Sequence, residues 1–323
     1  SATEGGAAMD KKRSAFAAPD AGRMTDAELS KRLGGLQRRS AAWLLVGLAG
    51  AVSGTVCFFT VQAALLRAIL VTVLFFGGVC CAVVFGGGAQ KKLKALMHEQ
   101  LGDFFRSEWE KTFGPDIHTP EMRIDEPFMK ALHLLDGEWE TCSVENFHEG
   151  EYGGVRFSAA NVRLDHVYQR GTPHEGFETC SSMVFRGLVL RCAARVSAAS
   201  PVLAAVRTVD SPRGILTGHA AFDRSFCVAA DSEQDAVRLL TPQTIGFLTA
   251  FDRSVEGQLL SLCWRENTFS LALETDYAFA AVAGSVDLRD LDAVRRSYVR
   301  SLQEMCCVLD QLKASPALTG AAE

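Results

Sequence analysis

Residues 41–89 read AAWLLVGLAGAVSGTVCFFTVQAALLRAILVTVLFFGGVCCAVVFGGGA, and only Gln62 and Arg67 interrupt this apolar stretch with strongly polar side chains. Division at these two residues leaves segments 41–61 and 68–89. Each is about the 20 residues that a helix needs to cross the hydrocarbon core of a bilayer. The pattern therefore predicts two transmembrane helices. Because the connection is too short to hold a folded element, we expect a tight antiparallel hairpin.

Two other interpretations of this stretch are disfavoured. Buried helices of a soluble protein rarely lack charges over such a length. A cleaved signal peptide has a shorter apolar region and lies closer to the start of a chain. The lipid bilayer is thus the first partner that the sequence predicts.

The glycines of the two segments suit close contact between helices in lipid. Gly50 and Gly54 form a pair of small residues four positions apart, which favours close approach of a second helix. We predict that the hairpin packs at these two residues. The same kind of contact would allow oligomers to form through the hairpin.

Cations flank both segments on the same side of the predicted membrane. These flanking cations are Arg38, Arg39, Lys91, Lys92 and Lys94, with Lys31 and Arg32 further out. The connection between the segments carries Arg67 alone. By the positive-inside rule, both termini lie in the cytoplasm. We expect a multi-pass protein of an inner or plasma membrane.

Composition limits the functions of the remaining chain. With 323 residues and a net charge of −5, the chain does not have the basic excess of a protein whose main partner is nucleic acid. Its ten cysteines are scattered or adjacent, and no CxxC occurs. Free thiols in a reducing compartment are the simplest interpretation, which agrees with a cytosolic domain. No cofactor is indicated.

The chain divides around the hairpin into five further parts. We expect a disordered N-terminal segment at 1–24, a short basic juxtamembrane helix at 25–40, an amphipathic linker helix at 90–114, a cytosolic domain at 115–313 and a disordered tail at 314–323. Thr25 is a candidate cap for the juxtamembrane helix, whereas Gly34 and Gly35 weaken it. The glycines at 86–88 loosen the exit from the second span, so the linker helix is expected to resume near Lys91.

The linker helix carries one apolar stripe. Its members recur every four residues: Leu93, Met97, Leu101, Phe105, Trp109 and Phe113. We expect this stripe to pack against the cytosolic domain. A partner helix or the membrane surface are the alternatives.

The middle of the cytosolic domain alternates with the period of two that is typical of strands. The turn signal Gly153 and Gly154 separates two such runs. Residues 177–196 form a long strand or a bent pair of strands, with Val184 on the same face as Leu188, Leu190 and Cys192. Residues 197–201 are expected to break this strand.

The later half of the domain alternates strands and helices. A strand at 226–228 precedes a helix that Thr241 caps and Pro242 begins. A hairpin follows, with its turn at Glu266 and Asn267. A long apolar stripe then predicts a C-terminal helix that starts at Asp287 or Asp290.

Strands grouped in the middle and helices at both ends predict an α+β fold on a mainly antiparallel sheet. We find no internal repeat in the sequence.

Short motifs within these elements resemble a known family. They are residues 154–158 (Gly-Val-Arg-Phe-Ser), residues 184–188 (Val-Phe-Arg-Gly-Leu), residues 222–228, and the Leu-Thr-Pro block within residues 236–242. Together with the twin spans they make the chain resemble the bacterial membrane proteins classed as domain of unknown function 3137, over roughly residues 93–312. The family usually has an aromatic pair where this chain has Val189 and Leu190. The resemblance implies a bacterial membrane protein, and it implies no activity, ligand or catalytic residue.

Potential zinc ligands gather in one place. His166, His174 and Cys180 lie close in sequence, with Glu175 beside them. Their spacing fits no closed tetrahedral pattern. We expect a loop that happens to contain two histidines, and no metal.

Two cysteines are candidates for a thiol nucleophile. Cys142 has Glu145 and His148 near it in sequence, and Cys227 has His219. Catalytic partners are usually adjacent only in space, so this closeness is weak support. We expect each cysteine to be a small buried apolar residue.

The remaining motifs are read structurally. The glycines at 86–88 are followed by Ala89 and Gln90 and not by the lysine and hydroxyl of a P-loop. Cys306 and Cys307 are expected to pack on the last helix. Acylation of Cys80 and Cys81 is an open alternative.

No convergent set of acid, base, nucleophile or metal ligands emerges. We therefore predict a membrane-anchored protein whose α+β domain is a non-catalytic binding or scaffold module with a protein partner. One alternative is a membrane-tethered hydrolase that uses Cys142 or Cys227. Another is a subunit of a membrane transport or envelope assembly, whose spans meet others through Gly50 and Gly54.

Overall fold

The computed structural model describes residues 24–132, 138–172, 176–208 and 214–314. The chain forms two compact units, residues 1–103 with 287–291 and residues 104–286 with 292–323. Of the segments that we expected to be disordered, only Met24 and Ala314 fall within the described residues.

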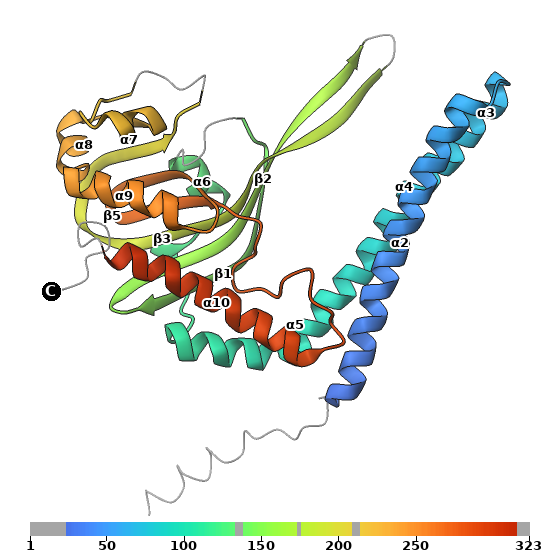
Figure 1. Cartoon of the computed structure of the whole chain (residues 1–323), viewed down its shortest axis with the longest axis horizontal. Helices are drawn as coiled ribbons and strands as arrows, with labels where there is room; N and C mark the ends of the chain where they lie inside the picture. Colours follow the sequence, from blue (N-terminus) through green and yellow to red (C-terminus); the bar gives the residue numbers. More distant parts are fainter. Residues whose placement is uncertain (1–23, 133–137, 173–175, 209–213, 315–323) are drawn as a thin grey trace, which may run out of the picture. The chain divides into compact units, whose positions relative to one another are not determined.

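The first unit is a pair of long helices (Figure 1). Helix α2 (Asp26–Thr60) begins at Thr25, whose side chain accepts a hydrogen bond from the backbone N–H of Glu28 at 3.3 Å. The expected juxtamembrane helix is therefore continuous with the first apolar segment. Gly34 does not break it: a Cβ there would lie 2.2 Å from Cγ of Arg289, so this glycine makes room for the segment that packs on α2.

The second helix is also continuous. It comprises α3 (Ala64–Val71), a π-helical turn at Thr72–Phe76, α4 (Gly77–Cys81), a second π-helical turn at Ala82–Gly86, and α5 (Gly87–Phe113). Arg67 thus lies inside this helix, and its N–H donates to the carbonyl of Ala63 at 2.9 Å. The expected loosening at residues 86–88 does not occur, since Gly86 ends the second π-helical turn and Gly87 begins α5 without a break.

Both helices are long and apolar enough to cross a membrane. Large apolar side chains along them are exposed: the exposed fraction is 65% for Leu45, 79% for Phe59 and 78% for Leu65. A soluble helix pair would bury such side chains, whereas lipid is a suitable surrounding for them.

The second unit has the α+β fold that the sequence predicts. Its antiparallel sheet consists of β1 (Thr141–Tyr152), β2 (Val155–Thr172), β3 (Gly176–Val206), β4 (Phe226–Ala230) and β5 (Gln258–Glu274). The strands follow the order β1-β2-β3-β4, and β5 also pairs with β3. Gly153 and Gly154 both have positive φ, 56° and 82°, which is the requirement of the tight turn expected between β1 and β2.

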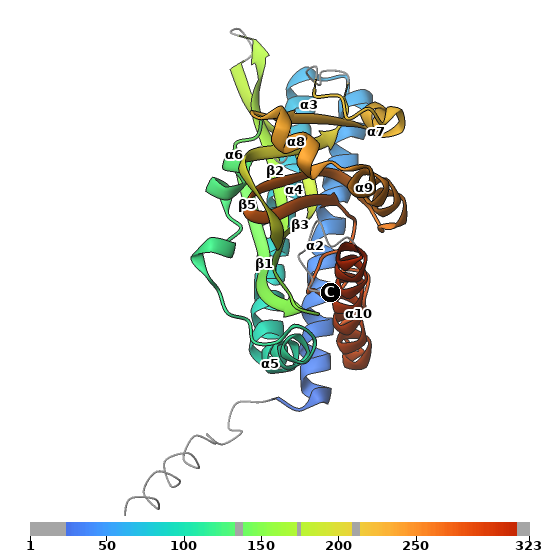
Figure 2. The same ribbon diagram turned by 90° about the vertical axis from the view of Figure 1, so that its left-hand side faces the viewer.

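Helices cover both faces of this sheet (Figure 2). The larger core joins one face to the end of α5, α7 (Ala220–Ser225), α8 (Glu233–Leu239), α9 (Pro242–Ser254) and α10 (Leu291–Lys313). The smaller core joins the other face to α6 (Glu126–Leu132) and the segment before it, which includes the 3-10 turn Pro120–Met122.

Several local predictions are confirmed. Trp109 and Phe113 are each 1% exposed and belong to the larger core, with Phe105 packed against it. The end of the linker stripe thus packs on its own domain. The side chain of Thr241 caps α9 by accepting a hydrogen bond from the N–H of Thr244 at 3.2 Å.

The expected break at residues 197–201 is wrong, because β3 continues through it to Val206. The register against β5 shifts between Ala193 and Ala198 and again before Val202. Such irregular pairing accommodates Pro201, which cannot donate to a regular ladder.

The expected hairpin within β5 is also wrong. Both halves of the strand pair with β3, residues 268–274 with 187–193 and residues 261–266 with the later part of β3. A hairpin would pair the two halves with each other. Glu266 has a positive φ of 53°, but the strand only bends there and continues along β3.

Val184 does not share a face with Leu188. The register of β2 against β3 shifts where Leu164 pairs with Phe185 and Asp165 with Met183, so Val184 is the extra residue of a bulge. A bulge reverses the alternation. Val184 therefore packs against the smaller core, whereas Leu188 belongs to the larger one.

Candidate ligand-binding cavity

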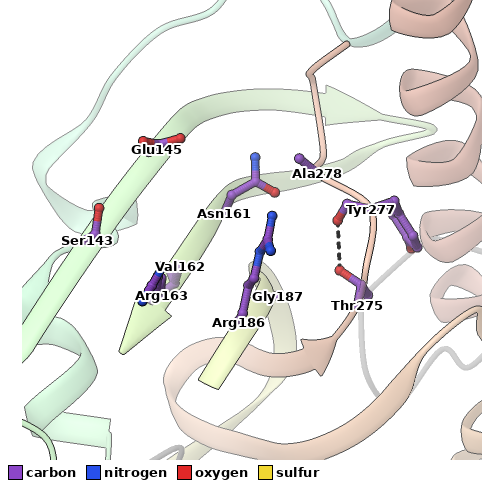
Figure 3. A pocket seen from close by; sticks show the side chains of 10 residues that line it. All are labelled: Ser143, Glu145, Asn161, Val162, Arg163, Arg186, Gly187, Thr275, Tyr277 and Ala278. Atoms are coloured by element: carbon purple, nitrogen blue, oxygen red, sulfur yellow. Dashed lines mark hydrogen bonds between the residues drawn. The ribbon is translucent and has the colours of Figure 1, made fainter. Parts of the chain in front are cut away.

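A polar cavity of about 250 Å³ lies between the sheet and the segment that follows β5 (Figure 3). Strands β1, β2 and β3 and the segment after β5 supply its lining, which comprises Ser143, Glu145, Asn161, Val162, Arg163, Arg186, Gly187, Thr275, Tyr277 and Ala278.

Strand pairing brings the polar side chains together. Ser143 pairs with Arg163, and Arg163 pairs with Arg186, so one row crosses three strands. Asn161 lies two residues from Arg163 and therefore on the same face. Because Asn161 pairs with Leu188 of the larger core, the row lies just beyond the end of that core.

Gly187 lets the segment after β5 close over this row. A Cβ at Gly187 would lie 1.9 Å from the carbonyl oxygen of Leu273. Only glycine allows the two backbones to approach this closely. The N–H of Thr275 then donates to the carbonyl of Arg186 at 3.4 Å, and its hydroxyl donates to the carbonyl of Tyr277 at 2.9 Å.

Asn161 fixes the covering segment at its far end. Its amide accepts from the N–H of Phe279 and donates to the carbonyl of Phe279, both at 2.8 Å. Asn146 donates to the same carbonyl at 3.3 Å. Phe279 itself is 1% exposed and packs against Trp109. The cavity is therefore formed before any ligand enters.

The two arginines of the cavity differ in their partners. Arg163 donates three hydrogen bonds to Asp165, at 2.8 to 3.1 Å, which raise the pKa of Arg163. Arg186 forms no ion pair with any residue that the structure describes. Figure 3 shows its side chain beside Asn161, directed toward the covering segment.

Tyr277 and acidic side chains complete the surroundings. Burial, followed by the charges of Glu304 and Glu256, raises the pKa of Tyr277 to about 12, so its hydroxyl keeps its proton. A neighbouring cavity of about 400 Å³ shares Arg186, Thr275 and Tyr277. Its acidic lining residues are Glu256, Glu274 and Asp276.

A second polar group lies on β1 and the segment after α5. The side chain of Glu149 is 3% exposed and accepts hydrogen bonds from Arg156 at 2.5 and 3.1 Å. It also accepts from the N–H and hydroxyl of Thr119, at 2.7 and 2.8 Å. Burial raises the pKa of Glu149, but these hydrogen bonds outweigh it and hold the pKa below its usual value. The hydrogen bonds between Thr119 and Glu149 thus hold the 115–119 segment against β1.

His148 belongs to the same region and not to Cys142. Its Nδ1 lies 2.7 Å from a carboxylate oxygen of Asp116, and its ring stacks on Trp109. Cys142 pairs with Leu164 and packs against the smaller core, on the opposite face of the sheet. Burial, and then Glu126 and Asp125, raise the pKa of the Cys142 thiol, which is the opposite of nucleophile activation.

The other cysteine candidates are placed as follows. Cys227 is 6% exposed on β4, whereas His219 is exposed before α7. Cys306 is half-buried and packs against the larger core, and Cys307 is exposed.

The predicted cluster of potential zinc ligands falls partly outside the described residues, which do not include His174 and Glu175. His166 lies 3.1 Å from Glu140, and Cys180 pairs with Tyr168. Among the residues that the structure describes, no three His, Cys, Asp or Glu side chains are arranged to hold a metal ion.

In the first unit, the predicted packing glycines face the second helix. A Cβ at Gly50 would lie 2.6 Å from the carbonyl oxygen of Leu74, and one at Gly54 would lie 3.0 Å from Cβ of Phe75. Gly78 of the second helix lies directly opposite Gly50. Both predicted glycines therefore contact the other helix of the same chain.

The flanking cations lie on the surface of the first unit, and the adjacent cysteines lie on its second helix. Arg38, Arg39, Lys91, Lys92 and Lys94 are exposed. Cys80 is exposed and Cys81 half-buried, and the glycines at 86–88 lie within the continuous second helix.

Most of the cavity lining was not predicted from the sequence. Glu145 was named only beside Cys142, Arg186 and Gly187 only within the motif that resembles a family, and Asn161 and Arg163 not at all. A signal was present: the run from Val155 alternates, and its inward positions change from Phe157 and Ala159 to Asn161 and Arg163. Polar residues at inward positions of a strand mark the end of a core or a site within it.

No family model and no curated protein matches this chain. A solved structure, the mycobacterial trehalose monomycolate transport factor A (TtfA), is similar to it at 12% sequence identity, with a TM-score of 0.30. The similarity covers 65% of this chain and 95% of that one. A TM-score of this size does not assign the two chains to one fold.

Proposed function

We propose that this chain is a multi-pass membrane protein whose helical hairpin anchors a cytosolic α+β domain, and that this domain is a non-catalytic binding module. Both termini lie in the cytoplasm under this proposal. Membership of the bacterial family that the motifs resemble belongs to the same proposal and adds no activity.

One observation carries the membrane part of the proposal. The two apolar helices direct small residues at each other and large apolar side chains outward. Gly50 and Gly78 lie in contact, while Leu45, Phe59 and Leu65 are at least 65% exposed. Membrane helices associate in this way, because lipid replaces the core that would cover apolar side chains in water.

The cavity at Arg186 supports a binding role for the domain. It lies on three strands, is covered by a segment that Asn161 fixes, and is lined mainly by polar side chains, of which Ser143, Glu145, Arg163 and Arg186 are exposed. Neither candidate thiol favours catalysis, because the pKa of Cys142 is raised and Cys227 is buried. A thiol nucleophile needs the opposite environment.

Cysteine labelling tests the topology. Cys307 is exposed on α10, and Cys263 is 1% exposed on β5. In single-cysteine variants treated with a membrane-impermeant maleimide, we expect Cys307 to react in inverted vesicles and not in intact cells. Cys263 is the matched control and should react in neither until detergent denatures the domain. Labelling of Cys307 in intact cells would place the domain outside the cytoplasm and refute the proposed orientation.

A further inference from the structure

Arg163 and Arg186 are a cross-strand pair of like charges. They are directly opposite each other in the ladder of β2 and β3. Like charges in this position destabilise a sheet unless something compensates them. Asp165 compensates Arg163 through three hydrogen bonds. Arg186 has no such partner among the described residues.

The guanidinium of Arg186 reaches a cavity that is already built. Gly187 beside it permits the close backbone approach that closes the cavity, and Asn161 holds the cover. The side chain of Arg186 is exposed and has no ion-pair partner among the described residues, so its guanidinium is open to a ligand that enters the cavity. This arrangement favours binding over a structural role for the charge.

The surrounding charges limit the ligand. Glu145 lines the same cavity, and Glu256, Glu274 and Asp276 line the neighbouring one. A multiply charged anion would be repelled by these carboxylates, whereas a singly charged oxyanion matches one guanidinium. Arginine holds such a group through two parallel hydrogen bonds. Ser143 and Tyr277 add hydroxyl groups to the lining.

We propose that this cavity binds the singly charged oxyanion of a small ligand, a carboxylate or a phosphodiester, on Arg186. The inference rests on the binding role proposed above and specifies its ligand chemistry. It does not depend on the orientation in the membrane, so its failure would leave the labelling result for Cys307 intact.

The experiment uses the full chain in a non-ionic detergent and follows unfolding in acetate, in dimethyl phosphate and in chloride of equal ionic strength. A Trp43→Phe background leaves Trp109, Trp139 and Trp264, all in the α+β unit, as the fluorescent reporters. We expect a saturable rise of the unfolding midpoint with one of the two oxyanions. The anion that gives the rise identifies the source of the group.

Arg186→Gln should weaken the apparent affinity for that anion at least tenfold. In chloride its unfolding midpoint should equal or exceed that of the parent, because the like charge opposite Arg163 in the ladder is removed. Arg186→Lys, which keeps the charge and loses the planar fork, should bind with intermediate affinity. The matched control is Arg253→Gln, an exposed arginine of α9 outside the cavity lining, which should bind like the parent.

The absence of a saturable rise with either anion in the parent would overturn the proposal, as would an Arg186→Gln variant with unchanged affinity. If that variant does not fold, the binding of the anion at Arg186 can be tested by modifying the arginines of the parent with phenylglyoxal. The anion should protect Arg186 and leave Arg253 unprotected, and equal modification of Arg186 with and without the anion would overturn the proposal.

Discussion

Replacement of Arg156 by methionine should leave the carboxylate of Glu149 in the sheet without its cation. Removing one partner of a fully buried ion pair costs about 3–5 kcal/mol. Here the side chain of Arg156 is 48% exposed, and Thr119 still donates two hydrogen bonds to the carboxylate. We therefore expect a smaller loss in the free energy of unfolding at pH 7, about 2 kcal/mol, or about 4–8 °C in Tm for a unit of this size.

The pH dependence identifies the cause. The pKa of Glu149 is below its ordinary value of 4.5 in the folded protein. Stability from this pair is thus fully present above the unfolded pKa and is lost as the pH falls through the folded pKa. The difference between parent and Arg156→Met should be complete at pH 7 and should shrink below about pH 4.

Urea unfolding in the Trp43→Phe background measures this difference. Glu149→Gln combined with Arg156→Met should recover part of the loss, because the buried charge is gone. Lys111→Met breaks the exposed pair with Glu108 and should change the free energy of unfolding by less than about 1 kcal/mol. A loss below about 0.5 kcal/mol at pH 7, or an equal loss at pH 3, would refute the assignment of this stability to the ion pair.

Three further experiments test the close approaches and the thiols. Gly187→Ala should destabilise the domain by about 1–3 kcal/mol in urea unfolding, since its Cβ would meet the carbonyl of Leu273 at 1.9 Å. Gly246→Ala on α9, where nothing lies within 4 Å, should instead stabilise it by up to about 1 kcal/mol. Gly50→Ile should separate the hairpin helices at a lower SDS concentration than Gly77→Ile, because only Gly50 contacts the other helix; equal sensitivity would contradict this contact. Burial raises the pKa of Cys192 and of Cys263 to about 12, so Ellman's reagent at pH 8 should react with Cys307 at once and with these two only on unfolding.

The sequence was sufficient where a local pattern and its environment agree. The apolar segments, the glycine turn between β1 and β2 and the Thr241 cap each depend on neighbours within a few residues. The stripe of α10 was equally clear, because every fourth or third residue from Leu291 to Leu312 is apolar and buried. Such features need no knowledge of the distant parts of the chain.

The missed features depend on distant pairing. Glu266 and Asn267 have the sequence of a hairpin turn, but both halves of β5 pair with β3 and not with each other. Val184 looks aligned with Leu188 until the bulge against Leu164 and Asp165 is placed. The cavity is a similar case, because Arg163 and Arg186 are 23 positions apart and meet only through strand register.

Strand β3 pairs with β2, β4 and β5. The last of these in the sequence, β5, ends only at Glu274. During translation the apolar parts of the two helices emerge before the sheet, and after Gly86 a further 188 residues (274 − 86) must follow before the sheet can close. At about 5–20 residues per second, this takes roughly 10–40 s. Under the proposed membrane anchoring, the newly made chain is already held at the bilayer before β5 and α10 cover the apolar faces of β2 and β3. The anchor would then limit how many neighbouring chains those faces can meet.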